Sequence, residues 1–120
     1  MTIYLALNAI VWFPYGLWCL VRPETLTAFA GVTMLTPTAV AEVRAMYGGL
    51  QAAVGAIAVT ALVRPDHRRT IVMVLGVLTA GLGAARLIAA LSGAGFSAYT
   101  GGAVVFELGS AAWAAVLLRR

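Results

Sequence analysis

Two charged residues stand inside apolar runs that are long enough to cross a lipid bilayer as helices. Arg86 interrupts the run 70–91, and Glu107 interrupts the run 101–118. A charge at that depth is costly because hydrocarbon gives it no hydration, so it needs a partner and usually has a function. The sequence therefore predicts an ion pair between Glu107 and Arg86, and marks this pair as a candidate binding site.

A second polar group lies near the start of the run 40–63. Arg44, Tyr47 and Gln51 follow the three-and-four spacing that places side chains on one helix face, and Arg44 is expected to be a second cationic partner of Glu107. Glu42 lies about 200° away from Arg44 at 100° per residue, so both cannot point into one cavity. We expect Glu42 either at the positive end of the helix dipole or as an acceptor of hydrogen bonds from the interfacial segment.

These polar residues lie at a similar depth along their runs. We count from the end of each run that is predicted to face the outside of the cell. Each run then has a polar residue four to six positions from that end, which is roughly 6–9 Å at the rise of an α-helix. These residues are Tyr15, Arg44, Arg86 and Glu107. The opposite half of the runs contributes only Asn8. The sequence predicts a polar pocket in the outer half of the membrane, and its expected binding residues are Arg44, Gln51, Arg86, Glu107, Tyr15 and Glu24.

Three functions and one purely structural role fit this pocket. The first function is binding of a lipophilic or amphipathic small molecule, or service as an accessory subunit; no cofactor is evident, and a lipid or a quinone is left open as ligand. The second is an isomerase or cyclase on a lipophilic substrate, with catalytic residues Glu42, Glu107 and Tyr47. The third, an oligomeric transporter, ranks last because the first run has no acidic residue. Alternatively, the ion pairs only fix helix register.

The elements that position these residues are four apolar runs, 3–21, 40–63, 70–91 and 101–118. With 62% hydrophobic and 10% charged residues and a mean hydropathy of +0.98, the chain lies far outside the soluble globular range. We predict an all-α integral membrane protein, one four-helix bundle over 1–120, with short links at 64–69 and 92–100 that form hairpins.

Turn and capping residues add detail to this plan. Pro23 and Gly31 suggest a short interfacial helix over 23–30, and Thr36-Pro37-Thr38 supplies the cap and the first proline for the second long helix. Rows of small residues predict close helix packing. They are Gly48 with Ala52, Gly49 with Ala53, and Gly76 with Ala80 and Ala84.

The basic residues predict the orientation. Five of the eight arginines lie at 64–69 and 119–120, so by the positive-inside rule both termini and the middle link are cytoplasmic. The pI near 10.0 does not indicate nucleic-acid binding, because these residues sit at helix ends and form no solvated patch. Cys19 is the only cysteine, which rules out an intramolecular disulfide, and the only histidine, His67, is expected to be solvated in the middle link.

The stretch 41–50, Ala-Glu-Val-Arg-Ala-Met-Tyr-Gly-Gly-Leu, resembles the signature of an uncharacterised family of small bacterial four-helix membrane proteins that is distantly similar to the DoxX-like group. Arg22-Pro23-Glu24, Arg86 and Glu107 extend the resemblance over nearly the whole chain. It implies a bacterial inner-membrane location. The partners that we expect for such a protein are membrane lipids, a second copy of the chain in a homo-oligomer, or another membrane protein. DoxX-like relatives include a subunit linked to quinone-coupled thiosulfate oxidation and eukaryotic assembly factors, but this chain lacks the cysteine pair of a dithiol role.

Overall fold

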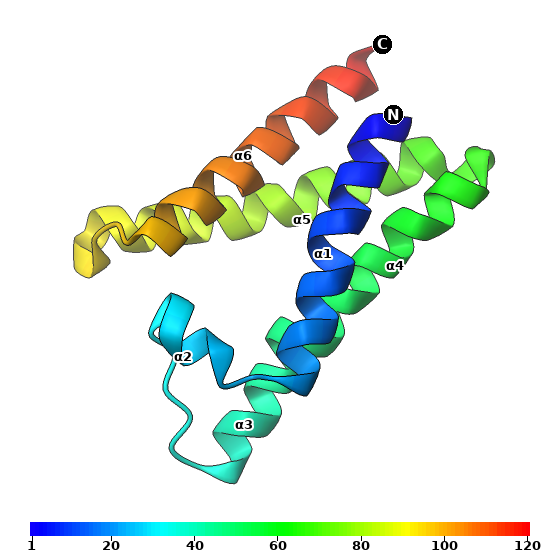
Figure 1. Ribbon diagram of the computed structural model, residues 1–120. Coiled ribbons are helices and arrows are strands. Elements are labelled where there is room, and N and C mark those ends of the chain that lie inside the picture. Colours follow the sequence, from blue (N-terminus) through cyan, green and yellow to red (C-terminus); the bar gives the residue numbers. More distant parts are fainter. The chain divides into compact units, whose positions relative to one another are not determined.

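The computed structural model describes all 120 residues, and every ordered element in it is helical. Figure 1 shows the long helices and the short segments that join them. The elements are α1 (Thr2–Val21), α2 (Thr25–Ala30), α3 (Pro37–Val43), the π-helical turn η1 (Arg44–Gly49), α4 (Leu50–Val63), the 3₁₀ turn η2 (Pro65–His67), α5 (Arg68–Ala89), the π-helical turn η3 (Ala90–Ala94) and α6 (Ala98–Arg119). The predicted all-α class is confirmed.

Four helical stretches are long and apolar enough to cross a membrane: Thr2–Val21, Pro37–Val63, Pro65–Ala94 and Ala98–Arg119. They correspond to the four predicted runs, which identifies a multi-pass membrane protein. The chain divides into two compact units, Thr2–Pro65 and Asp66–Arg120, and each is described by itself. The predicted single domain over 1–120, and the predicted hairpin at 64–69, concern how these units pack, and they stay predictions.

In the first unit, α1 packs antiparallel to η1 and α4 at glycine positions (Figure 1). A Cβ added to Gly16 would collide with the backbone of Ala52, and one added to Gly55 would collide with that of Phe13. Further along, a Cβ on Gly48 would lie 2.8 Å from the Cα of Leu20. The two backbones approach closely because these positions carry no side chain, which is how membrane helices gain contact area.

The predicted rows of small residues are only partly right. Gly48 and Ala52 do face α1, but Gly49 is exposed and a Cβ there would meet only the carbonyl oxygen of Arg44, at 3.9 Å. The reason is that adjacent helical residues point about 100° apart, so Gly49 is turned away when Gly48 faces α1. On α5, the positions that face α6 are Gly76 and Gly83, whereas Ala84 is exposed.

The start of the second long helix follows from its cap. Thr36 has extended backbone angles and its side-chain oxygen accepts a hydrogen bond from the backbone N–H of Ala39 at 3.1 Å. Pro37 occupies the first turn, where its missing N–H costs nothing. The helix therefore begins at Pro37, three residues before the start of the predicted run.

The short helix α2 lies against the end of α1. It begins at Thr25, two residues later than predicted, because Pro23 and Glu24 form the preceding turn, and it ends at Gly31 in the left-handed conformation (φ 68°). Its buried Leu26 forms a cluster with Cys19 and Val43. This apolar contact fixes α2 across the end of α1 and the start of the second long helix.

In the second unit, α5 packs antiparallel to α6 through a short link. The link between α5 and α6 consists of residues 95–97 and is shorter than the predicted link 92–100, since η3 extends α5 to Ala94 and α6 begins at Ala98. Gly93 (φ 121°) and Gly95 (φ 73°) adopt backbone angles that other residues avoid. Ser97 then caps α6, and its Oγ accepts from the N–H of Thr100 at 3.0 Å. These three local features let the chain reverse within a few residues.

Candidate functional site

The predicted ion pair between Arg86 and Glu107 is present and uses two parallel hydrogen bonds. Nε of Arg86 donates to Oε2 of Glu107 at 3.0 Å, and Nη2 donates to Oε1 at 2.9 Å. This fork geometry is the strongest arrangement for the two groups. The Glu107 side chain is 4% exposed and the Arg86 side chain is 23% exposed. The accessible part of the pair is therefore its cationic part.

Gly83 makes room for this pair, one turn before Arg86 on α5. A Cβ on Gly83 would lie 3.1 Å from the Cβ of Glu107 and 2.7 Å from Cδ2 of Leu108. The close approach of α6 at this point lets the short Glu107 side chain reach the guanidinium. Sequence reasoning did not assign Gly83 to the site, because the contact depends on the packing of two helices.

Tyr99 is the third member of the site, and it was not predicted. The Cζ atom of Arg86 lies 5.8 Å from the centre of the Tyr99 ring, within the range of a cation–π interaction. The spacing Tyr99–Ala103–Glu107, four residues at each step, was a signal in the sequence, because residues four apart lie near one another on a helix surface.

Both members of the pair lie well inside their helices. Arg86 is eight residues before Ala94, and Glu107 is nine residues after Ala98, which places both about 12–14 Å from those ends at the rise of an α-helix. The predicted depth of roughly 6–9 Å below the outer hydrocarbon boundary stays a prediction, because helix ends do not mark that boundary.

The predicted residues of the first unit do not form a comparable ion pair. Arg44 and Glu42 are exposed, while Tyr15 and Tyr47 are half-buried against the cluster of Cys19, Leu26 and Val43. The Oε1 atom of Gln51 is buried and has no hydrogen-bond partner. The predicted contact between Arg44 and Glu107 would join the two units, and it stays a prediction.

The expected role of Glu42 at the helix dipole is wrong. Because the helix begins at Pro37, Glu42 is its sixth residue and no acidic residue occupies its first turn. The dipole acts mainly on charges within the first turn.

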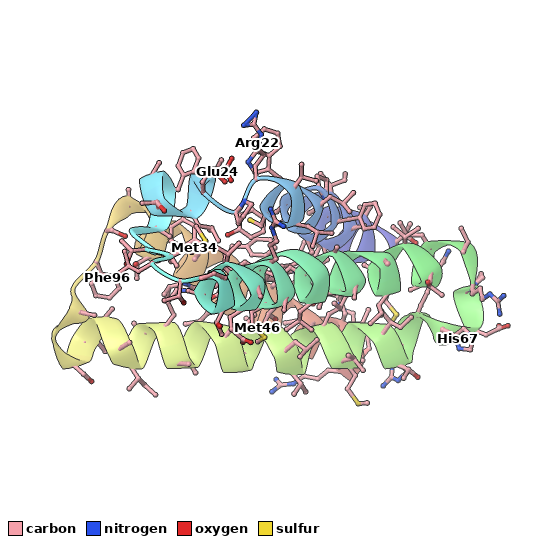
Figure 2. All side chains as sticks on the ribbon, turned by 90° about the horizontal axis from the view of Figure 1, so that it is seen from below. Arg22, Glu24, Met34, Met46, His67 and Phe96 are labelled. Atoms are coloured by element: carbon pink, nitrogen blue, oxygen red, sulfur yellow. The ribbon has the colours of Figure 1, made fainter.

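Glu24 is engaged at the surface. Its Oε1 lies 3.5 Å from Nη1 of Arg22, and both side chains are about three-fifths exposed. Figure 2 shows these two labelled residues close together at the edge of the molecule. His67 lies in the exposed turn η2 at the end of a long helix, as expected of a loop residue (Figure 2).

The first half of α1 carries buried side chains with polar groups, of which only Asn8 was singled out from the sequence. The Nδ2 group of Asn8 donates to the carbonyl oxygen of Tyr4 at 3.0 Å, and Nε1 of Trp12 donates to Oδ1 of Asn8 at 3.0 Å. All three side chains are buried. These two bonds link residues one turn apart on a single helix.

The fold and the site define a small multi-pass α-helical membrane protein that holds a forked arginine–glutamate pair within one helix hairpin. No three His, Cys, Asp or Glu side chains lie close enough together to hold a metal ion. The model of the family described as "Domain of unknown function (DUF4345)" matches residues 1–118, and the chain belongs to this family. Comparison with curated proteins and with solved structures found no significant match. The more distant DoxX-like relationship stays a prediction.

Proposed function

We propose that this protein binds an amphipathic, lipophilic molecule, a lipid or a quinone, at the accessible edge of Arg86. The observation that carries this proposal is the unequal exposure of the pair: the carboxylate of Glu107 is enclosed, while the guanidinium of Arg86 remains partly accessible. A ligand that approaches the site therefore meets positive charge and N–H donors.

The chemistry of the site favours oxygen acceptors. A guanidinium presents planar donors that suit carbonyl, carboxylate and phosphate oxygens. Glu107 holds the group in one orientation, and the Tyr99 ring lies over it. Exposed apolar side chains on the same two helices, including Leu82, Ile88 and Val105, offer a surface for the apolar body of such a ligand.

Binding fits these groups better than acid–base catalysis. Both carboxylate oxygens of Glu107 accept hydrogen bonds from Arg86, so the carboxylate serves to orient the guanidinium of Arg86. Glu42, the other candidate acid, is exposed. The location that accompanies this proposal is a bacterial inner membrane with both termini in the cytoplasm, and accessory service to another membrane protein is compatible with it.

The test is native mass spectrometry of the protein extracted in a mild detergent, with added decylubiquinone as a defined quinone. The informative variant is the double substitution Arg86→Gln with Glu107→Gln, which removes both charges but keeps two side chains that can hydrogen-bond. We expect the wild type to carry a lipid or quinone adduct, and the double variant to lose at least about tenfold in its occupancy.

The matched control is Arg64→Gln with Asp66→Asn, which removes one positive and one negative charge at exposed positions outside the predicted pocket and should leave the adduct unchanged. Equal adduct occupancy in the wild type and in the folded Arg86/Glu107 double variant would refute the proposal. The pair would then be a structural link between α5 and α6.

A further inference from the structure

A second polar feature of the unit Asp66–Arg120 lies at the far end of the same helix pair. Residues from the start of α5 and the end of α6 line an open cleft of about 320 Å³. Its lining combines one cation, one hydroxyl and two apolar side chains, namely Arg69, Thr70, Met73 and Leu118. This combination of a charged mouth and an apolar wall is amphipathic.

Arg69 is fixed at this cleft by a contact between the helices. Its Nη2 donates to the carbonyl oxygen of Leu118 at 2.6 Å. That carbonyl belongs to the last turn of α6, where carbonyl groups lack partners within the helix. The bond restrains the long arginine side chain, so less conformational entropy is lost when the rest of the guanidinium binds an anion.

The charge around the cleft is strongly positive. Arg68 precedes Arg69 on α5, and Arg119 and Arg120 follow Leu118, whereas Asp66 is the only acidic residue at this end of the unit. Such clusters beside membrane helices attract anionic lipids. The charge is therefore complementary to a phosphate-bearing headgroup.

We propose that this cleft binds the phosphate of an anionic phospholipid, with Arg69 and Thr70 contacting the headgroup and Met73 and Leu118 contacting the first part of an acyl chain. The site is distinct from the one proposed around Arg86. The two arginines are 17 residues apart on α5, or roughly 25 Å along the helix. The two proposals therefore fail or succeed separately.

The test measures binding of dioleoyl phosphatidylglycerol to the purified full chain in a neutral detergent, by native mass spectrometry with increasing lipid. Dioleoyl phosphatidylcholine and inorganic phosphate are titrated in parallel. We expect Arg69→Gln to weaken binding of phosphatidylglycerol about tenfold, the loss expected for a charge-assisted contact. The comparison is made in the Arg86→Gln/Glu107→Gln background, which removes the other proposed lipid site. The control Arg64→Gln removes the same charge five residues earlier in the chain, at a position that does not line the cleft, and should change affinity less than threefold.

A second variant keeps the test decisive if Arg69→Gln fails to fold. Met73→Trp fills the cleft without changing charge, and should also weaken phosphatidylglycerol binding about tenfold. Its control is Val77→Trp, one turn further along α5 at an exposed position outside the lining. Val77→Trp should bind like the wild type.

Four outcomes would overturn the proposal. If Arg64→Gln weakens binding as much as Arg69→Gln, the basic end attracts lipid without a defined site. If phosphatidylcholine binds as tightly as phosphatidylglycerol, or inorganic phosphate displaces phosphatidylglycerol at equal concentration, the anionic lipid is not the ligand. If Met73→Trp and Val77→Trp bind equally well, the cleft does not hold the acyl chain.

Discussion

The two units of this protein each contain an antiparallel pair of membrane-length helices, but different contacts hold the pairs together. In the first unit, α1 approaches the second long helix at Gly16, Gly48 and Gly55, where backbone packs against backbone. In the second unit, glycines also face the partner helix, but a forked ion pair crosses from α5 to α6. The helices of the first unit pack through close backbone contact alone. Those of the second unit are also joined by an ion pair, and its attraction has to offset the free-energy cost of burying the two charges.

Two ion pairs, one in each unit, give a matching contrast. Arg22 and Glu24 are two residues apart, largely exposed, and joined by a single contact at 3.5 Å. Arg86 and Glu107 come from different helices and form two shorter bonds around a buried carboxylate. Only the second pair combines the long-range contact, the burial and the partial access that a binding site requires.

The largest expected effect is on the glycine contacts. Gly16→Ala should lower the free energy of unfolding by about 3 kcal/mol, because the added methyl group has no space against the backbone of Ala52. Gly109→Ala is the control, since no atom lies within 4 Å of a Cβ there, and it should stabilise α6 by up to about 1 kcal/mol. Unfolding of each variant in a series of detergent concentrations measures both changes in the free energy of unfolding. Equal stability of the two variants would contradict the close packing of α1.

The next effect concerns the buried carboxylate. Glu107→Ala should destabilise the second unit by about 2–3 kcal/mol, because it leaves Arg86 partly buried without its partner. Adding Arg86→Leu to this variant should recover part of the loss, since the unpaired charge is removed. A double-mutant cycle in the same detergent measures the coupling, and additive effects of the two substitutions would argue against the ion pair.

A smaller effect is expected at Tyr99. Tyr99→Leu should lower stability by about 1 kcal/mol through loss of the cation–π contact with Arg86. Tyr99→Phe keeps the ring face and should stay close to the wild type. If the two variants lose the same amount of stability, the hydroxyl group and not the ring face accounts for the contribution of Tyr99.

The smallest effect is expected at the exposed pair. Arg22→Ala should change the free energy of unfolding by less than about 0.5 kcal/mol, because solvent screens both side chains. Thermal unfolding at low and high salt measures this change. A loss comparable to that of Glu107→Ala would mean that exposure does not separate the two pairs.

Local features of the sequence predicted a large part of the fold. The four long helices follow from four apolar runs, and Thr36, Pro37 and Gly31 mark helix ends where predicted because capping and turn preferences act over a few residues. The partnership of Arg86 with Glu107 was also predictable, since embedded opposite charges need each other. The roles of Arg44, Gln51 and Tyr15 in a pocket stay predictions.

The sequence by itself determined the membrane class, the four helical stretches and the ion pair of this protein, because apolar length, caps and uncompensated charge are properties of the chain. The tertiary structure alone decided where the π-helical turns η1 and η3 occur, which glycines face a partner helix, that Tyr99 lies over Arg86, and that Arg69 joins the end of α6 at a cleft. These features depend on the register and close approach of helices that are distant in sequence, and a small difference in packing energy sets them.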